Sequence, residues 1–329
     1  MHEIENLKIK VSMHKSKCPV CHSSHTKKNG SHKGTQTYKC IDCGYRFRNG
    51  KLPPESTLWR LYQDNKQTVS ELSSIFSVSE STIKRRLQCV KLEWHQPALH
   101  GSGYVHLDAT YWGHNWGVML GLDDASGHPL YLAFIKSETN ADYLAAINSI
   151  ASRGYTIDGL IFDGRPSLFP LFSGYRIQMC QFHMKAIIRR YLTKKPRLQA
   201  SRELKTLVEG LTTASKDNFM RDFTRWKEKW HDAIFRRTVL KSGKTQYTHR
   251  RLHQAARSLN SYIPYLFTFQ ECPGMPNTNN KIEGTFTDLK RNLNNHSGMT
   301  LKNRKRFIIG FFLALRQTRS MKKQDTHRR

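Results

Sequence analysis

The sequence is poor in acidic residues and has no long apolar run. Of its 329 residues, 25 are acidic and 54 are lysine or arginine, which gives a formal net charge of +29. The longest apolar stretch, residues 307–315, is far shorter than the roughly 20 residues of a membrane span, and no signal peptide leads the chain. We therefore expect no membrane segment, and we expect a polyanionic partner because such a charge excess repels itself unless phosphates neutralise it.

Cysteine is also scarce, and its spacing indicates a metal site rather than disulfides. Four of the seven cysteines form two Cys-x-x-Cys pairs, Cys18 with Cys21 and Cys40 with Cys43, separated by 18 residues. A redox motif or chance spacing would explain one pair, but two pairs at this distance predict a structural four-cysteine zinc ribbon over residues 1–50. Reduced thiols of this kind are typical of a cytoplasmic protein.

Residues 51–98 change in character and favour three short helices. Pro53 and Pro54 interrupt the chain, three apolar stripes follow, and Ser79 is placed to cap the third helix. We interpret this region as a helix-turn-helix domain, although an ordinary three-helix bundle with a solvated basic face would show the same pattern. The third helix would present its polar residues to DNA: Thr82, Lys84, Arg85 and Arg86.

Residues 99–315 are β-rich at first and then helical. Strands are predicted at 104–111, 116–123, 129–135, 157–162 and 175–180, with a helix at 140–151 after the third. This order is that of an RNase H-like α/β fold. A helical insertion is predicted at about 184–275, with an aromatic stripe that we assign to its core: Phe219, Phe223, Trp226 and Trp230. Residues 316–329 form a basic tail.

Charge is distributed unevenly within this part of the chain. Residues 104–163 hold seven acidic and two basic residues, whereas residues 301–329 hold ten basic residues and one acidic residue. Asp108 and Asp163 each close an apolar run, and in the predicted fold their strands are neighbours. Glu283 lies on the first turn of a later amphipathic helix, where it would either complete a three-carboxylate site for divalent metal ions or simply favour the helix N-terminus.

These motifs resemble the catalytic domain of Mutator-type DDE transposases of bacterial insertion sequences, in their zinc-binding variant. The elements that carry the resemblance occur in the family's order: Asp108-Ala-Thr, Asp163-Gly, Cys180-Gln-Phe-His183, and Asn279-Asn-Lys-Ile-Glu283-Gly followed by a Leu-Lys-Arg helix. The resemblance spans most of the chain.

The resemblance implies a DNA transposase that binds the ends of an insertion sequence, cleaves DNA and transfers a 3′-hydroxyl to target DNA. Asp108, Asp163 and Glu283 would hold two Mg²⁺ ions, with Mn²⁺ as a substitute. Cys180 and His183 would support the active site, since two ligands are too few for a second zinc. Lys290 and the basic tail would contact phosphates. A homodimer of a bacterial, nucleoid-associated cytoplasmic protein is expected.

Two other functions remain open at this stage. A transposase-derived, non-enzymatic DNA-binding protein would be expected to have lost a carboxylate, and all three are present. An RNase H-type nuclease or junction resolvase would not need the zinc ribbon, the helix-turn-helix or the long insertion.

Overall fold

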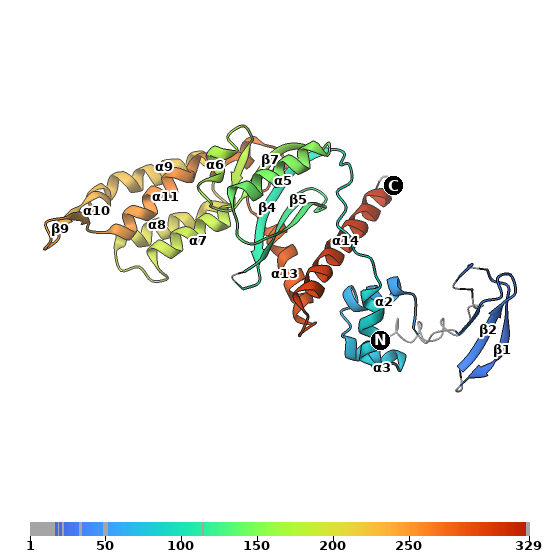
Figure 1. Cartoon of the computed structure of the whole chain (residues 1–329). Coiled ribbons are helices and arrows are strands. Elements are labelled where there is room, and N and C mark those ends of the chain that lie inside the picture. Colours follow the sequence, from blue (N-terminus) through green and yellow to red (C-terminus); the bar gives the residue numbers. More distant parts are fainter. Residues whose placement is uncertain are drawn as a thin grey trace. The chain divides into compact units, whose positions relative to one another are not determined.

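The computed structural model describes residues 17–18, 20–21, 23–32, 35–48, 52–113 and 115–326 (Figure 1). The first 16 residues of the predicted ribbon, His114 of a predicted turn and the last three residues of the basic tail lie outside this description. The chain divides into two compact units, residues 1–93 with 292–311, and residues 94–291 with 312–329. Among the described helices, none combines the length and the apolar character that crossing a membrane requires.

In the first unit, the N-terminal residues form a small antiparallel sheet. Its strands are β1 (Thr26–His32), β2 (Thr35–Cys40) and β3 (Arg46–Arg48), paired in that order. Tyr38 and Phe47 stack across β2 and β3 with ring centroids 5.9 Å apart. A sheet this small buries too little apolar surface to fold unaided, so its stability depends on a further cross-link.

The three predicted helices of the first unit are present as α2 (Glu55–Gln63), α3 (Val69–Phe76) and α4 (Glu80–Gln88). Thr68 and Glu71 form a capping box at the start of α3. Ser79 caps α4 as predicted, because its hydroxyl accepts a hydrogen bond of 3.3 Å from the backbone N–H of Thr82.

Residues 292–311 group with these helices, although the sequence was interpreted as placing them in the catalytic domain of 99–315. They comprise the end of α13 (Asn280–Asn294) and the start of α14 (Leu301–Thr326). The ring of Tyr62 lies 4.2 Å from that of His296 and 5.8 Å from that of Phe307. Gln63 donates a 3.2 Å hydrogen bond to the carbonyl of Phe307. Three helices of eight or nine residues have little core of their own, and this late segment supplies more.

The second unit is built on a five-stranded mixed sheet. Its strands are β4 (Ser102–Tyr111), β5 (Gly117–Asp123), β6 (Pro129–Ile135), β7 (Thr156–Phe162) and β8 (Ile177–Met179), in the order β6-β5-β4-β7-β8. β4, β5 and β6 pair in antiparallel fashion, whereas β7 and β8 run parallel to β4. All five predicted strands are confirmed, with ends displaced by at most a few residues.

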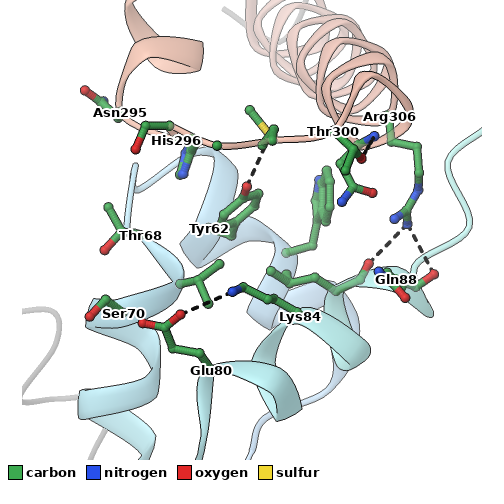
Figure 2. Close-up of a pocket in the computed structure, with 17 residues that line it drawn as sticks. Tyr62, Thr68, Ser70, Glu80, Lys84, Gln88, Asn295, His296, Thr300 and Arg306 are labelled. Atoms are coloured by element: carbon green, nitrogen blue, oxygen red, sulfur yellow. Dashed lines mark hydrogen bonds and ion pairs between the residues drawn. The ribbon is translucent and has the colours of Figure 1, made fainter.

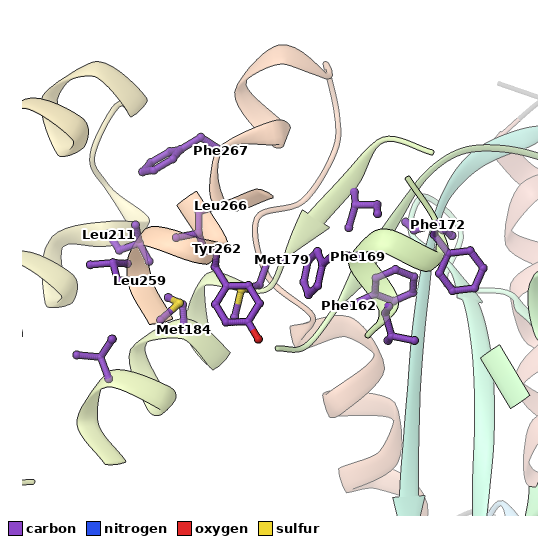
Figure 3. Close-up of a cluster of buried hydrophobic side chains, with 14 of the residues drawn as sticks. Phe162, Phe169, Phe172, Met179, Met184, Leu211, Leu259, Tyr262, Leu266 and Phe267 are labelled. Atoms are coloured by element: carbon purple, nitrogen blue, oxygen red, sulfur yellow. The ribbon is translucent and has the colours of Figure 1, made fainter. Parts of the chain in front are cut away.

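Side chains along β4 point alternately to the hydrophobic core and to a more polar face of the sheet. Val105 and Leu107 are fully buried within the main hydrophobic cluster, which also includes the inner face of α5 (Asn140–Ser152). His106 and Asp108 point to the opposite side of the sheet, because successive strand residues alternate. The cluster continues from the sheet into the insertion through Phe162, Met184 and Tyr262 (Figure 3).

The insertion consists mainly of α7 (Gln181–Leu192), α8 (Gln199–Glu209), α9 (Lys216–Lys229), α10 (His231–Phe235) and α11 (Arg250–Leu266). The short helices α6 (Leu168–Leu171), η1 (Gly210–Thr212) and α12 (Thr268–Glu271) also belong to this unit. The predicted aromatic stripe of α9 is part of the core, with Phe219, Phe223 and Trp226 at 2%, 0% and 5% exposure.

The expectation of an all-helical insertion is wrong. Residues Arg237–Val239 (β9) and Thr245–Tyr247 (β10) form an antiparallel hairpin (Figure 1). Its strands have only three residues each, too few to show alternation in the sequence. The turn between them depends on Gly243, whose φ of 77° is in the left-handed region that glycine adopts readily.

Candidate active site and metal sites

The two aspartates are brought together by the register of neighbouring parallel strands. His106 on β4 is paired with Ile161 on β7. Asp108 lies two residues after His106, and Asp163 lies two residues after Ile161. Because side chains two residues apart on a strand point to the same face, both carboxylates lie on the face of the sheet that His106 and Ile161 occupy. Because neighbouring strands are about 4.8 Å apart, the two carboxylates lie side by side at one end of the sheet.

The two aspartates are half-buried and, in the described part of the chain, neither forms an ion pair within 4.0 Å. Burial and the negative charge of Asp163 raise the pKa of Asp108 well above its ordinary value. Burial also raises the pKa of Asp163, against the opposing effect of His183, and Glu138 and Glu283 raise it further. Within the described residues, Oδ1 of Asp163 is buried with no hydrogen-bond partner. A cation is the natural complement to such a group.

Glu283 is held near this pair by hydrogen bonds at the start of α13. His106 on β4 has its Nδ1 2.6 Å from Oδ1 of Asn279 and its Nε2 2.9 Å from Asp124. The backbone N–H of Asn279 donates to Sγ of Cys180 at 3.2 Å, and its carbonyl accepts the N–H of Glu283. The helix that carries Glu283 is thus attached both to the central strand and to the end of β8.

Cys180 and His183 lie beside Glu283, which makes three possible ligands where the sequence suggested two. The ligand atoms of Cys180, His183 and Glu283 all lie within 4.8 Å of one another. Nδ1 of His183 is 3.5 Å from Oε1 of Glu283, and neither buried atom has a hydrogen-bond partner in the part of the chain that the structure describes. Burial raises the pKa of Cys180 to about 11, so its thiol stays protonated and accepts from Asn279 at neutral pH.

Glu138, a fourth carboxylate, was missed as a site residue. It precedes the N-cap of α5, accepts a 2.8 Å hydrogen bond from the hydroxyl of Tyr143, and lies 3.4 Å from Arg165. Its charge contributes to the raised pKa values of both Asp108 and Asp163. The one available signal was its position in the acidic region, directly after the third strand of the sheet.

The four ribbon cysteines converge as predicted into a cluster that could hold a zinc ion. Sγ of Cys18 is 3.5 Å from that of Cys43, and Sγ of Cys21 is 3.5 Å from that of Cys40. Tetrahedral Zn–S bonds of about 2.3 Å place sulfurs roughly 3.8 Å apart, so the spacing fits. Although burial opposes it, hydrogen bonds from the backbone of Cys21 and Val20 lower the pKa of Cys18 to about 7. None of the seven cysteines forms a disulfide.

The predicted DNA-contacting residues of α4 are in different surroundings. Arg85 is exposed, and Thr82 is half-buried against Ser79. Lys84 is exposed but pairs with Glu80 at 3.2 Å. Arg86 is half-buried and pairs with Glu55 of α2 at 2.8 Å. Lys290 lies exposed on α13 in the second unit.

A cavity of about 560 Å³ lies beside α4, between the helices of the first unit and residues 295–306 (Figure 2). Its wall includes Lys84, Arg306 and the buried His296, whose Nε2 has no hydrogen-bond partner among the described residues. Arg306 donates to the backbone carbonyls of Leu87 and Val90 at the end of α4. The cations of this cavity are therefore engaged within the unit.

Comparisons with known proteins place few constraints on this chain. No family model matches it, and no curated protein matches it. Among solved structures, a chain from the cryoEM structure of the simian T-cell lymphotropic virus intasome in complex with PP2A regulatory subunit B56 gamma is similar at 13% identity. The match covers 62% of this chain and 72% of that chain, with a TM-score of 0.22.

Proposed function

We propose that this protein is a DNA transposase with an RNase H-like catalytic domain, which cleaves DNA and joins the resulting 3′-hydroxyl to target DNA. The observation that carries the proposal is the convergence of Asp108 and Asp163 on adjacent parallel strands, with Glu283 delivered by a helix 120 residues later in the chain. The strand order and the insertion before that helix support it.

The residues present fit divalent metal ions. Asp108, Asp163 and Glu283 offer hard carboxylate oxygens, and two of these oxygens are buried without a hydrogen-bond partner in the described structure. Raised pKa values indicate that the cluster resists full ionisation unless positive charge enters it. When bound, a pair of Mg²⁺ or Mn²⁺ ions would activate the attacking oxygen and stabilise the leaving oxygen of an in-line displacement.

The chain's own residues then have separable tasks. Asp108, Asp163 and Glu283 would hold the cations through their carboxylate oxygens. His106 and Asn279 fix the start of α13 and thereby the position of Glu283. His183, whose Nδ1 lies 3.5 Å from Oε1 of Glu283, would donate to a phosphate oxygen of the bound DNA.

The remaining modules would bring DNA to this site. The zinc ribbon and helices α2 to α4 would bind the terminal inverted repeats, with Arg85 as an exposed contact. The excess of positive charge would hold both DNA duplexes by their phosphates. Two ends must be paired before joining, so the active form would be a homodimer in the bacterial cytoplasm, associated with the nucleoid.

The test is a Mg²⁺-dependent cleavage and strand-transfer assay on duplexes that carry the DNA flanking the coding sequence. Asp108→Ala, Asp163→Ala and Glu283→Ala should bind these duplexes but neither cut nor join them. Asp158→Ala is the matched control, because Asp158 lies exposed on the same strand as the residues leading to Asp163. Cleavage without joining would favour a nuclease. If the wild-type protein binds these duplexes tightly but is no more active than its variants, the non-enzymatic DNA-binding function would be favoured.

A further inference from the structure

The β9–β10 hairpin lies in a stretch of strongly basic surface. Residues 233–251 contain no acidic residue. The six lysines and arginines in this stretch are all exposed, and in the part of the chain that the structure describes none of them pairs with a carboxylate. They are Arg236, Arg237, Lys241, Lys244, Arg250 and Arg251. Several exposed cations elsewhere on the insertion do have acidic partners, as Lys229 has in Glu203 at 2.8 Å.

A hairpin of two short strands is marginal in isolation, and here it is anchored at its base. The ring of Tyr247 on β10 stacks on His253 of α11 with centroids 3.6 Å apart and planes 13° apart. The guanidinium of Arg237 on β9 lies over the same tyrosine ring at 4.8 Å. The hydroxyls of Thr238 and Thr248 are 2.7 Å apart. The hairpin is therefore a preformed projection from α11.

The tip of the hairpin combines two exposed aliphatic residues, Val239 and Leu240, with the polar turn Lys241-Ser242-Gly243-Lys244. Val239 is 68% exposed and Leu240 is 39% exposed, although charged residues follow directly. The turn is closed by two backbone hydrogen bonds. The N–H of Leu240 donates to the carbonyl of Lys244 at 2.8 Å, and the N–H of Gly243, the left-handed residue of the turn, donates to the carbonyl of Leu240 at 2.9 Å. Two neighbouring aliphatic side chains at the tip of a cationic projection indicate a partner that is anionic on its outside and apolar within.

A basic groove adjoins the base of the hairpin. It encloses about 510 Å³ between the end of α7 and the start of α11. Its lining includes Lys195, Arg197, Arg250 and Arg251 and contains no acidic residue. The residues from Thr248 to Arg251 line the groove and follow β10 directly in the chain, so hairpin and groove form one continuous cationic surface on the insertion.

We infer that this hairpin and groove form a second duplex-DNA contact, distinct from helices α2 to α4, in which the cations bind phosphates and Val239 and Leu240 enter the minor groove. Apolar side chains inserted between base steps unstack them and bend the duplex, and a two-stranded ribbon is narrow enough to deliver them. The inference rests on the proposed function only in taking DNA, rather than another polyanion, as the partner.

The phosphate contacts are tested by the salt dependence of duplex binding by the full chain, without added divalent metal. The variant Lys241→Gln, Lys244→Gln, Arg250→Gln, Arg251→Gln should lower the slope of log K against log salt by about 3 to 4, since each lost phosphate contact removes about 0.9. The matched control replaces four ion-paired cations of the same insertion by glutamine: Lys216, Arg221, Arg225 and Lys229. Equal slopes for the two variants would overturn the inference.

The tip is tested by the bend of the bound duplex, measured as energy transfer between dyes at its two ends. Val239→Ser with Leu240→Ser should leave the salt slope unchanged but abolish the bend and weaken binding several-fold. An unchanged bend overturns the inference. A tip variant that binds and bends DNA normally but changes from dimer to monomer in light scattering also overturns it, since the tip would then be a protein interface.

The two proposals fail in different ways. A wild-type protein that binds no duplex at any salt concentration contradicts the proposed function itself. A wild-type protein that binds duplex, with hairpin variants indistinguishable from it, contradicts only the hairpin contact.

Discussion

The two candidate metal sites differ in how far apart their ligands lie in the chain. The four cysteines of the ribbon fall within residues 18–43, whereas Asp108, Asp163 and Glu283 span residues 108–283. The cysteines need only a hairpin to meet, and their spacing alone indicates their purpose. Asp108 and Asp163 lie side by side because their parallel strands pair in register. Glu283 is placed near them by the contacts of Asn279 with His106 and Cys180, so this site is sensitive to residues that are not themselves carboxylates of the site.

The largest expected effect falls on the carboxylate site. Asp108→Asn should lower cleavage at least about 10³-fold, because metal ions contribute several kcal/mol to such a reaction. The same variant should stabilise the metal-free protein by about 1 kcal/mol, since it removes an uncompensated charge from a site with a raised pKa. Chemical denaturation in the absence of metal measures the second effect. A variant that is both inactive and less stable than the wild type would show instead that Asp108 is structural.

Removal of zinc should have a large but local effect. Cys21→Ser should release one zinc ion per chain and unfold the β1–β3 sheet, because so small a module depends on its metal. Binding to end DNA should weaken about 10²-fold, while Mg²⁺-dependent cleavage of saturating DNA persists. Colorimetric zinc release and hydrogen exchange measure the loss. His25→Ala, an exposed ring in the same module, is the control and should retain zinc. If amides of the second unit also lost their protection from hydrogen exchange, the zinc site and the carboxylate site would not be independent of each other.

An intermediate effect is expected from the residues that position Glu283. His106→Ala breaks the contacts to Asn279 and Asp124 without touching a carboxylate of the site. Activity should fall about 10- to 100-fold, as is usual for groups that orient metal ligands, and the Mg²⁺ concentration for half-maximal rate should rise. His100→Ala, an exposed histidine just before β4 with no such contacts, should behave as wild type. A loss of rate with no change in metal requirement would assign His106 to the fold alone.

A smaller effect is expected in the pH dependence of stability. A carboxyl whose pKa is raised by folding stabilises the protein at low pH and loses that contribution as pH rises from 3.8 through the raised value. Mg²⁺ at about ten times its Kd should therefore raise Tm by a few degrees at about pH 8 and by less at about pH 5.5. Asp108→Asn should remove this difference in thermal unfolding. An equal shift at both pH values would place the bound ion elsewhere.

The smallest effect is expected at Cys180. Its pKa of about 11 means that the thiol is neutral and acts as a hydrogen-bond acceptor for Asn279. Cys180→Ser should keep that role and cost less than about fivefold in Mg²⁺-supported activity. A much larger loss, together with bound zinc in the wild-type second unit, would show that Cys180, His183 and Glu283 hold a soft metal ion instead.

The sequence allowed much of this architecture to be predicted, but unequally. Apolar runs ending in Asp108 and Asp163 predicted the strands well, because buried strands carry a strong signal. The hairpin was missed because its three-residue strands are exposed and lack periodicity. Glu138 was missed because an acidic residue before a helix cap is common in any protein. The ion pair between Arg86 and Glu55 was not predicted, because helical spacing does not reveal which basic residue contacts Glu55.

By itself, the sequence determined the local features of this protein: the cysteine spacing, the helix caps, the strand cores and the overall charge. These features depend on residues that are close together in the chain or on composition alone, so they can be predicted directly from the sequence. Only the tertiary structure decided which distant groups meet. Strand register brings Asp108 to Asp163, the link from His106 to Asn279 brings Glu283 toward them, and residues 292–311 join the helices of the first unit. Such contacts depend on how the chain packs as a whole, and no short segment encodes them.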